Sequence, residues 1–489
     1  MMKNKIQLIT YPDSLGGNLT ILGKLLKERF MEVFPGGVHI LPPFPSTGDR
    51  GFAPTTYREI NPAFGTWADI HAIGATFDVM IDIMVNHISA YSRYFQGFVK
   101  QGRKSPFADM FITLDKVWPD GNPPAEDVKK IFLRKPEHPF LDVEIEGTGA
   151  IERIWASFGP RADYSEQIDL DIRSSVTRQF FIELLQFLSE QKIKLIRLDA
   201  IGYVIKKPGT SCFMVEPEVY EFIDWLIEVA FGLDLQLLPE VHAHYTTQFK
   251  LASHGYWVYD FILPLLVLHT LETKDPSKLL DHLENCPRKQ ITILDCHDGI
   301  PVQPDLDEIL EVEEAKRIVG LCLERGANLN RILSESKQKD GFDAHQINIT
   351  YYDALGKNDD AYLAARAIQV FTPGVPQVYY VGLLAGENDY LGVETTGEGR
   401  AINRHNFSEQ EIDAALTKDV VQRLIWLIRF RNQHEAFNGE FSIAERNEAG
   451  FILRWENKNQ FCELTIDLEH CYSEISYTDE NAQLHRYSI

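Results

Sequence analysis

The chain has 489 residues, of which 44% are hydrophobic, and a formal net charge of −23 at pH 7. This length exceeds that of one simple domain but suits a large barrel with insertions. A chain this acidic is a poor general binder of nucleic acid or of anionic membrane surfaces. No apolar run is long enough to span a membrane, and the first residues enter a strand pattern without the apolar core of a signal peptide.

The cysteines are irregularly spaced, and no two of them form a C-x-x-C pair. This pattern is typical of reduced thiols and predicts a cytoplasmic location without a metal site. The six residues are Cys212, Cys286, Cys296, Cys322, Cys462 and Cys471.

Strand and helix patterns alternate along most of the chain. Strands are expected at residues 6–10, 38–41, 79–85, 195–199, 235–241, 258–262, 291–294 and 376–381. Helices are expected at 21–30, 67–75, 175–189, 216–231, 361–371 and 421–432. Eight strands with interleaved helices predict a (β/α)8 TIM barrel in the α/β class.

Two polar stretches interrupt this alternation, and a third region follows it. We expect residues 1–87, 176–299 and 364–438 to form the barrel. Residues 88–175 and 300–363 are expected to be inserted subdomains, and residues 439–489 to be a small antiparallel β domain. The acidic run 305–314 is expected to be the solvated face of a helix.

The segment 195–203 reads Leu-Ile-Arg-Leu-Asp-Ala-Ile-Gly-Tyr and resembles a buried parallel strand. Arg197 and Asp199 are two residues apart, so on a strand they point the same way. Burying both is costly unless they pair or act. Other polar residues also follow predicted strands, where a barrel gathers its functional groups; they are Asp49, His87, Glu240, His242, His297 and Asp298.

Three of these residues are carboxylates at the ends of different strands, namely Asp199, Glu240 and Asp298. Each alone is also compatible with a helix cap or a structural ion pair. Together they fit a retaining glycosyl transfer, in which a nucleophile and a proton donor lie about 5–5.5 Å apart. The third carboxylate would stabilise positive charge at the anomeric carbon.

Short motifs around these residues resemble the signatures of glycoside hydrolase family 13, the α-amylase family. These motifs are Asp82 to His87, Arg197-Leu-Asp-Ala, Glu240-Val-His and His297-Asp. Longer segments resemble the sucrose phosphorylase subfamily, namely 45–52 (PSTGDRGF), 294–300 (LDCHDGI), 379–386 (YYVGLLAG) and 402–405 (INRH). The resemblance covers essentially the whole chain.

The resemblance implies a role for each matching residue. Asp199 would be the nucleophile, Glu240 the acid and then the base, and Asp298 the transition-state stabiliser. Phe52 and Tyr203 would form apolar walls against the sugar. The residues implied to hold glucose are Asp49, His87, Arg197, His297 and Arg400. The resemblance implies no metal and no organic cofactor.

The subfamily transfers glucose to inorganic phosphate, which requires a basic acceptor pocket. Its candidate residues are Arg134, Lys135, His242, Asp343, His345 and Gln346. His345 stands where the subfamily usually has tyrosine, and a histidine can donate to a second anionic group. This departure resembles the members that act on sucrose 6F-phosphate, which is phosphorylated on fructose.

Other interpretations stay open at this point. His345 is also compatible with drift in a loop, which would leave a phosphorylase of plain sucrose. A phosphorylase of glucosylglycerol or glucosylglycerate has the same fold and chemistry. A hydrolase is disfavoured by the phosphorylase-like segments, and an inactive binding module is disfavoured because all three carboxylates are present.

Overall fold

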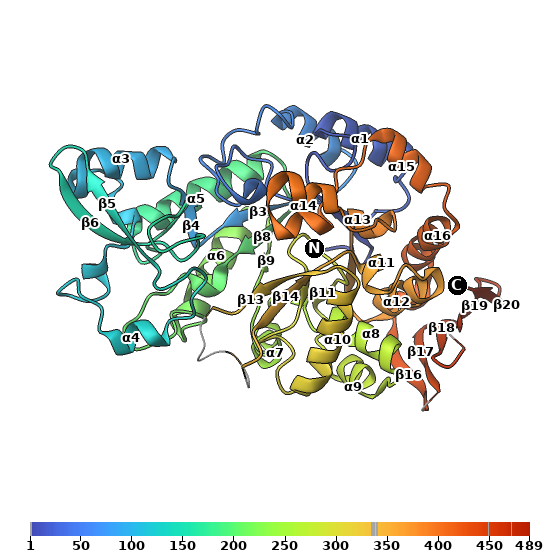
Figure 1. The fold of residues 1–489 in the computed structure, drawn as a ribbon. Coiled ribbons are helices and arrows are strands. Elements are labelled where there is room, and N and C mark those ends of the chain that lie inside the picture. The colour runs from blue at the N-terminus through green and yellow to red at the C-terminus, as the bar shows by residue number, and fades with distance from the viewer. Residues whose placement is uncertain (1, 334–337, 339–340, 448, 471) are drawn as a thin grey trace. The chain divides into compact units, whose positions relative to one another are not determined.

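The computed structural model describes every residue except 1, 334–337, 339–340, 448 and 471 (Figure 1). Cys471 therefore lies outside the described residues. The chain divides into two compact units. The first unit is Met1–His39, His242–Arg331 and Ala344–Ile489, and the second unit is Ile40–Val241 and Ile332–Asp343.

Among the described residues, eight strands form a sheet whose order follows the chain, except that the last of them in the chain pairs with the first. The order is β10 (Val258–Asp260), β11 (Gln290–Thr292), β15 (Val375–Tyr379), β1 (Gln7–Thr10), β2 (Gly37–Ile40), β3 (Val79–Met84), β8 (Leu195–Asp199) and β9 (Gln236–Pro239). Strands that neighbour each other in chain order, joined through helices, are the pattern of a (β/α)8 barrel. The predicted fold class is confirmed.

In the first unit, β10, β11, β15 and β1 pair in parallel. Side chains along these strands are buried, as expected when helices cover a parallel sheet. The helices and short strands of this unit are α1 (Leu19–Glu28), α7 (Tyr245–Ser253), α8 (Leu263–Thr273), α9 (Ser277–Asn285), β12 (Ile300–Pro301), α10 (Val312–Glu324), β13 (Asn328–Arg331), β14 (Ala344–Asn348), α11 (Tyr351–Ala354), α12 (Asp359–Phe371), α13 (Tyr380–Leu383), α14 (Tyr390–Thr396), α15 (Glu409–Ala415) and α16 (Asp419–Gln433).

In the second unit, β8 lies between β3 and β9, and Met84 is opposite Asp199. Helix α5 (Ser175–Glu190) begins at the N-cap Ser174 and buries one apolar face that includes Phe181 and Leu185. The other helices and strands of this unit are α2 (Trp67–Gly74), β4 (His87–Ser89), α3 (Arg93–Gln101), α4 (Ala125–Lys130), β5 (Phe140–Ile145), β6 (Ala150–Trp155), β7 (Gln167–Asp169) and α6 (Glu218–Phe231).

The segment between β4 and α5 has a small core of its own. Trp118, Phe140 and Trp155 are buried there with Ile112 and Cys212. Strands β5 and β6 form a hairpin beside α3, in the light blue and teal part of the ribbon (Figure 1). These aromatic side chains therefore stabilise the segment, and the predicted boundaries of the two insertions stay predictions.

The C-terminal residues form an antiparallel sheet in chain order, as predicted. Its strands are β16 (Glu440–Asn447), β17 (Gly450–Asn457), β18 (Gln460–Asp467), β19 (Tyr472–Thr478) and β20 (Leu484–Ser488). Burial alternates along β18, which is the pattern of a sheet with one face on a core.

Several predicted bounds differ from the observed ones by one or two residues, and one predicted element is wrong. The eighth strand ends at Tyr379 rather than 381, because the chain turns into the short helix α13 at Tyr380. The acidic run 305–314 is not a solvated helix face. Helix α10 begins only at Val312, and Asp305 is 1% exposed. A buried carboxylate at this point needs a partner, which the sequence pattern did not indicate.

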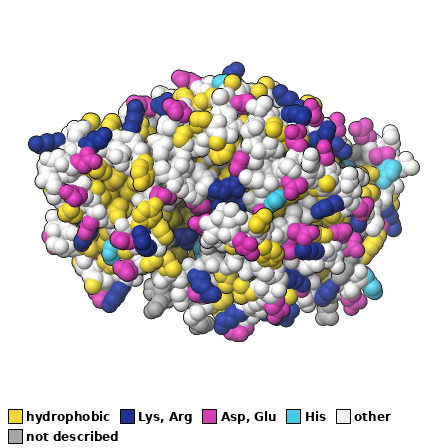
Figure 2. All heavy atoms as spheres, turned by 45° about the horizontal axis from the view of Figure 1, so that its top comes forward, with side chains coloured by type: hydrophobic (Ala, Val, Ile, Leu, Met, Phe, Trp, Pro, Cys, Tyr) yellow, Lys and Arg dark blue, Asp and Glu magenta, His cyan; other side chains and the backbone are white. Residues whose placement is uncertain are grey.

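Acidic and basic side chains are mixed over the face drawn in Figure 2, and neither sign covers a large continuous area. Among the described helices, none combines the length and apolar character that crossing a membrane requires.

Candidate active site

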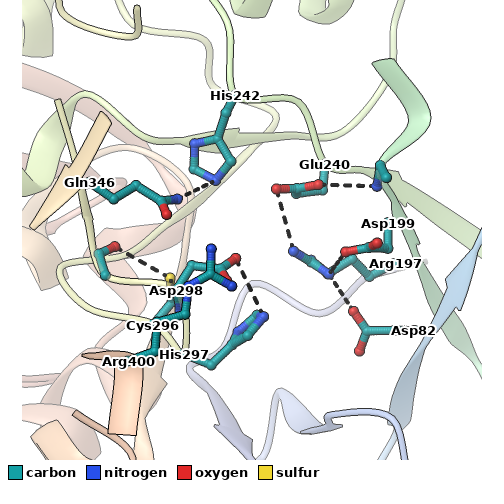
Figure 3. A network of polar contacts seen from close by, with 12 residues as sticks. Asp82, Arg197, Asp199, Glu240, His242, Cys296, His297, Asp298, Gln346 and Arg400 are labelled. Atoms are coloured by element: carbon teal, nitrogen blue, oxygen red, sulfur yellow. Dashed lines mark hydrogen bonds and ion pairs between the residues drawn. The ribbon is translucent and has the colours of Figure 1, made fainter. Parts of the chain in front are cut away.

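Arg197 on β8 is the centre of a carboxylate cluster in the second unit (Figure 3). Its Nη1 lies 2.5 Å from Asp82 Oδ1 and 3.0 Å from Asp199 Oδ1. Its Nη2 lies 3.5 Å from Glu240 Oε1. The guanidinium is 4% exposed and Asp82 is fully buried, so this cation compensates for several negative charges in a site with little water.

The chain turns sharply after Asp199, because Ala200 adopts a left-handed conformation with φ of 55°. The turn directs the Ala200 N–H toward Glu240, whose Oε2 accepts it at 3.3 Å. Asp199 and Glu240 thus contact the same guanidinium from neighbouring strands. Two carboxylates held in this way, one exposed by 15% and one by 10%, can serve as nucleophile and proton donor.

Asp49 lies in a tight turn of the second unit, the 3-10 segment Asp49–Gly51. Asp49 and Arg50 both have positive φ, at 39° and 47°. Gly51 has φ of 112°, and a Cβ there would lie 2.5 Å from the carbonyl oxygen of Pro42. Only glycine fits this approach, and strained backbone of this kind is frequent at functional sites.

His87 is buried beside this turn. Its Nε2 lies 3.0 Å from the carbonyl oxygen of Phe52, which also accepts from Gln167 at 2.9 Å. Burial lowers the pKa of His87 to about 4, although Asp169 acts in the opposite direction. His87 is therefore neutral near pH 7, with the Nε2 proton directed at the Phe52 carbonyl.

Aromatic rings surround Tyr203 in the second unit. The Phe158 ring is tilted against His87 and edge-on to Tyr203, with both ring centroids 5.2 Å away. Phe132 and Phe213 also pack against Tyr203. Phe132 is 8% exposed and belongs to this aromatic wall, while Phe158 and Tyr203 are half-buried.

The two basic residues expected in the acceptor pocket have different surroundings. Arg134 is half-buried, and its backbone forms a bridge with Phe158. Lys135 is fully buried, and its Nζ donates to the carbonyl oxygens of Phe140 and Ala162 at 3.3 and 3.2 Å. Burial lowers the pKa of Lys135 to about 8. Lys135 thus holds backbone together, and its contact with phosphate stays a prediction.

In the first unit, Asp298 lies among cationic and polar groups (Figure 3). Arg400 Nη1 is 3.1 Å from its Oδ1, and His297 Nε2 is 3.4 Å from its Oδ2. Asn348 donates to the Asp298 backbone oxygen at 2.5 Å. Gly299 follows with φ of 123°, and a Cβ there would lie 2.6 Å from the carbonyl oxygen of Ile347. This glycine lets the loop press against β14 and fixes Asp298.

Arg404 also contacts this cluster. Its Nε donates to the carbonyl oxygen of His297 at 2.8 Å, and its Nη2 is 3.9 Å from Asp298. Three consecutive side chains here could also coordinate a metal ion, because their ligand atoms lie within 4.8 Å of one another; they are Cys296, His297 and Asp298. Arg400 already holds the Asp298 carboxylate, and its charge opposes a metal cation there.

His242 and His345 lie close together in the first unit, with ring centroids 6.0 Å apart. The His242 ring is stacked on Phe261 at 3.9 Å, and its Nδ1 lies 3.6 Å from Asp305. Gln346 on β14 reaches His242 Nε2 at 3.5 Å. The sequence pattern missed Asp305 as a partner of His242, since its acidic neighbours resemble a solvated surface.

His345 is 2% exposed, and its Nδ1 lies 2.6 Å from the carbonyl oxygen of Gln303. A carbonyl only accepts, so Nδ1 carries a proton. Nε2 can then accept a proton or, in the charged imidazole, donate to an anion. Asp343 lies in the second unit, where its backbone oxygen accepts from Ile332.

The sequence analysis also missed Lys206 and Asp169, which form a buried ion pair at 2.7 Å in the second unit. Burial alone would raise the pKa of Asp169, but Lys206 and Ser157 outweigh it and lower this pKa. A lysine within the apolar run 201–206 was the available signal, because a buried ammonium needs a partner.

Comparison with known proteins gives a consistent result. Residues 35–262 match the model of the α-amylase catalytic domain. The chain is 55% identical, over 100% of both chains, to the sucrose 6(F)-phosphate phosphorylase of Thermoanaerobacterium thermosaccharolyticum. It is 43% identical to the sucrose phosphorylase of Streptococcus mutans, over 93% of each chain.

A solved structure is also similar over nearly the full length. The crystal structure of sucrose 6F-phosphate phosphorylase from Thermoanaerobacter thermosaccharolyticum superposes with a TM-score of 0.98. The two chains are 55% identical, and the match covers 100% of this chain and 99% of the other.

Proposed function

Because this chain belongs to the α-amylase family and, within it, to the sucrose phosphorylases, we propose that it cleaves sucrose 6F-phosphate with inorganic phosphate. The products are α-D-glucose 1-phosphate and fructose 6-phosphate. The observation that carries the proposal is the full-length identity of 55% to a relative named for this substrate, against 43% to one named for sucrose.

The carboxylates of the second unit supply the two steps of a double displacement. Asp199 attacks the anomeric carbon while Glu240 protonates the departing fructosyl oxygen, which leaves a covalent β-glucosyl-enzyme. Phosphate then attacks the same carbon and transfers its proton to Glu240, so the configuration is retained overall. Contact of both side chains with Arg197 supports this pairing.

The residues of the first unit act on the same sugar and its partners in this proposal. Asp298, held by Arg400 and His297, stabilises the positive charge that develops at the anomeric carbon. From the second unit, the residues assigned to the glucosyl unit are Asp49, Phe52, His87 and Tyr203. We propose no metal ion and no organic cofactor for the reaction.

His345 is the residue that we assign to the phosphate group on fructose. Its Nδ1 proton is directed at the Gln303 carbonyl, which leaves Nε2 as the atom that donates to an anion when the imidazole is charged. Arg134 is the cation of the second unit assigned to the acceptor pocket, together with His242, Gln346 and Asp343. The carbonyl contacts of Lys135 support a bracing role for it in this pocket.

The cellular location that we propose is the cytoplasm. Among the described cysteines, those outside disulfides are all buried, which supports a reducing compartment; they are Cys212, Cys286, Cys296, Cys322 and Cys462. Both substrates and both products of the proposed reaction are charged phosphate compounds. In the alternative reaction, the sugar substrate is plain sucrose, which carries no phosphate group.

The test is an assay of products with and without phosphate. Sucrose 6F-phosphate and inorganic phosphate should together yield α-glucose 1-phosphate, seen by its phosphorus and anomeric proton signals. Free glucose formed at the same rate without phosphate would instead identify a hydrolase. Product from glucosylglycerol or glucosylglycerate alone would favour those substrates, and no product from any sugar would identify an inactive binding module.

A further inference from the structure

Lys206 is a buried cation that the mechanism above does not use. Its side chain is 1% exposed, and its Nζ lies 2.7 Å from Asp169 Oδ2. The same nitrogen lies 2.9 Å from Asn86 Oδ1 and 3.3 Å from Ser157 Oγ, and it also donates to the backbone oxygen of Tyr203. These acceptors occupy the N–H groups of the ammonium, which compensates for the cost of burying it.

Three of these partners of Lys206 belong to or adjoin a residue assigned to the substrate. Asn86 directly precedes His87, and Asp169 is opposite His87 in the pairing of β4 with β7. The Tyr203 backbone oxygen belongs to the aromatic wall itself. One ammonium thus fixes the side of the site that faces glucose.

Ser157 connects the same ammonium to the loop of Arg134. The Ser157 N–H donates to Asp169 Oδ1 at 2.8 Å, and its hydroxyl donates to Oδ2 at 2.5 Å. The next residue, Phe158, forms the backbone bridge with Arg134 and contacts His87 and Tyr203. The position of Arg134 relative to the glucose wall therefore depends on the pair Lys206–Asp169.

A purely structural ion pair is the competing interpretation. Buried ion pairs seldom add stability over apolar residues of similar size. The side-chain contacts of Lys206 join short loop and edge segments that carry site residues, and Trp155 lies 5.5 Å from Nζ. This placement is what a positioning role requires.

We propose that Lys206 is a positioning residue that sets the Arg134 loop against the glucose wall, so that the glucosyl-enzyme reacts with phosphate rather than with water. The inference rests on the proposed function. In either reaction the ester bond between Asp199 and the anomeric carbon breaks. A phosphate oxygen or a water oxygen forms the new bond, and its proton passes to Glu240.

The test measures glucose 1-phosphate and free glucose in the same reaction at a fixed phosphate concentration. Their ratio does not depend on how much of the enzyme is folded, so a loss of stability alone cannot move it. For Lys206→Met we expect the ratio to fall at least about tenfold, which corresponds to ~1.4 kcal/mol between the two barriers. In Lys206→Arg, which keeps the charge, the ratio should fall less.

A matched control breaks a buried pair of the first unit. His282 Nε2 lies 2.9 Å from Asp260, and both side chains are buried. His282→Leu also removes the ionisable partner of a buried carboxylate, so it should lower stability and leave the product ratio unchanged. Ser157→Ala removes only the hydroxyl that joins Asp169 to the loop, and it serves if Lys206→Met does not fold.

The outcomes separate this inference from the proposed function. If the parent enzyme yields glucose 1-phosphate and the ratio is the same in Lys206→Met, Lys206→Arg and Ser157→Ala, Lys206 is only structural and the inference is overturned. If the parent yields no glucose 1-phosphate from any sugar, the proposed function itself fails and the inference fails with it.

Discussion

Replacing Arg197 by methionine should separate the structural cost of its charge from its role in the reaction. Asp82 is fully buried, and its Oδ1 lies 2.5 Å from Arg197 Nη1. Removing one partner of such a pair leaves an uncompensated buried charge, which typically costs about 3–5 kcal/mol. Asp199 and Glu240 would lose the cation that they share.

The double variant Arg197→Met/Asp82→Asn removes that buried charge as well. It should recover most of the lost free energy of unfolding, because a neutral amide replaces the orphaned carboxylate. Its kcat/KM should remain as low as that of the single variant, because the recovered stability does not return the cation to Asp199 and Glu240.

The pair Arg153–Asp142 provides a matched control in the same unit. Its nitrogen–oxygen distance is also 2.5 Å, but the two side chains are 53% and 50% exposed. An exposed pair contributes at most about 1 kcal/mol, so the free energy of unfolding of Arg153→Met should stay close to that of the parent. Urea unfolding measures these differences. Equal losses for Arg153→Met and Arg197→Met, or activity regained together with stability in the double variant, would refute the reasoning.

Three further predictions concern single side chains. Asp199→Ala should abolish release of glucose 1-phosphate while the protein stays folded; turnover at the parent rate would exclude Asp199 as nucleophile. Burial lowers the pKa of His87 to about 4, so between pH 6.5 and 4 only the unfolded state binds this proton. The free energy of unfolding should therefore decrease by up to about 3 kcal/mol as the pH is lowered from 6.5 to 4. His87→Gln should lose less stability over that range, and an equal loss would contradict the burial argument. Burial lowers the pKa of Lys135 to about 8, so between pH 8 and 10.5 only the unfolded state holds this proton. The free energy of unfolding of the parent should therefore increase from pH 8 to pH 10.5. Lys135→Met should lack this increase, which unfolding measured at both pH values would show.

The barrel strands could be predicted from the sequence because burial on both sides leaves short continuous apolar runs. The fourth strand, Leu195–Asp199, was predicted with its observed bounds. The eighth strand was predicted to end two residues too late, since Tyr380 and Val381 suit a buried strand as well as they suit α13. Local pattern thus gives the element but not the residue at which the backbone turns.

The strand-end carboxylates could also be predicted, because polar residues stand out after apolar runs. The partners of these residues could not. Asp169 and Lys206 are 37 positions apart in a segment without regular alternation, and only tertiary structure brings them to 2.7 Å. Asp305 was assigned to the surface because its neighbours are acidic, yet it is buried near His242. Lys135 resembles a ligand for phosphate in sequence, but its Nζ is directed at backbone carbonyls.

The measurement that tests the central claim most directly is kcat/KM for release of glucose 1-phosphate from sucrose 6F-phosphate and from sucrose, in the parent enzyme and in His345→Tyr. Each tenfold preference corresponds to about 1.4 kcal/mol of differential transition-state binding. We expect the parent to prefer the phosphorylated sugar strongly and His345→Tyr to lose much of that preference. Equal or better use of sucrose by the parent would contradict the claim and identify the enzyme as a phosphorylase of plain sucrose.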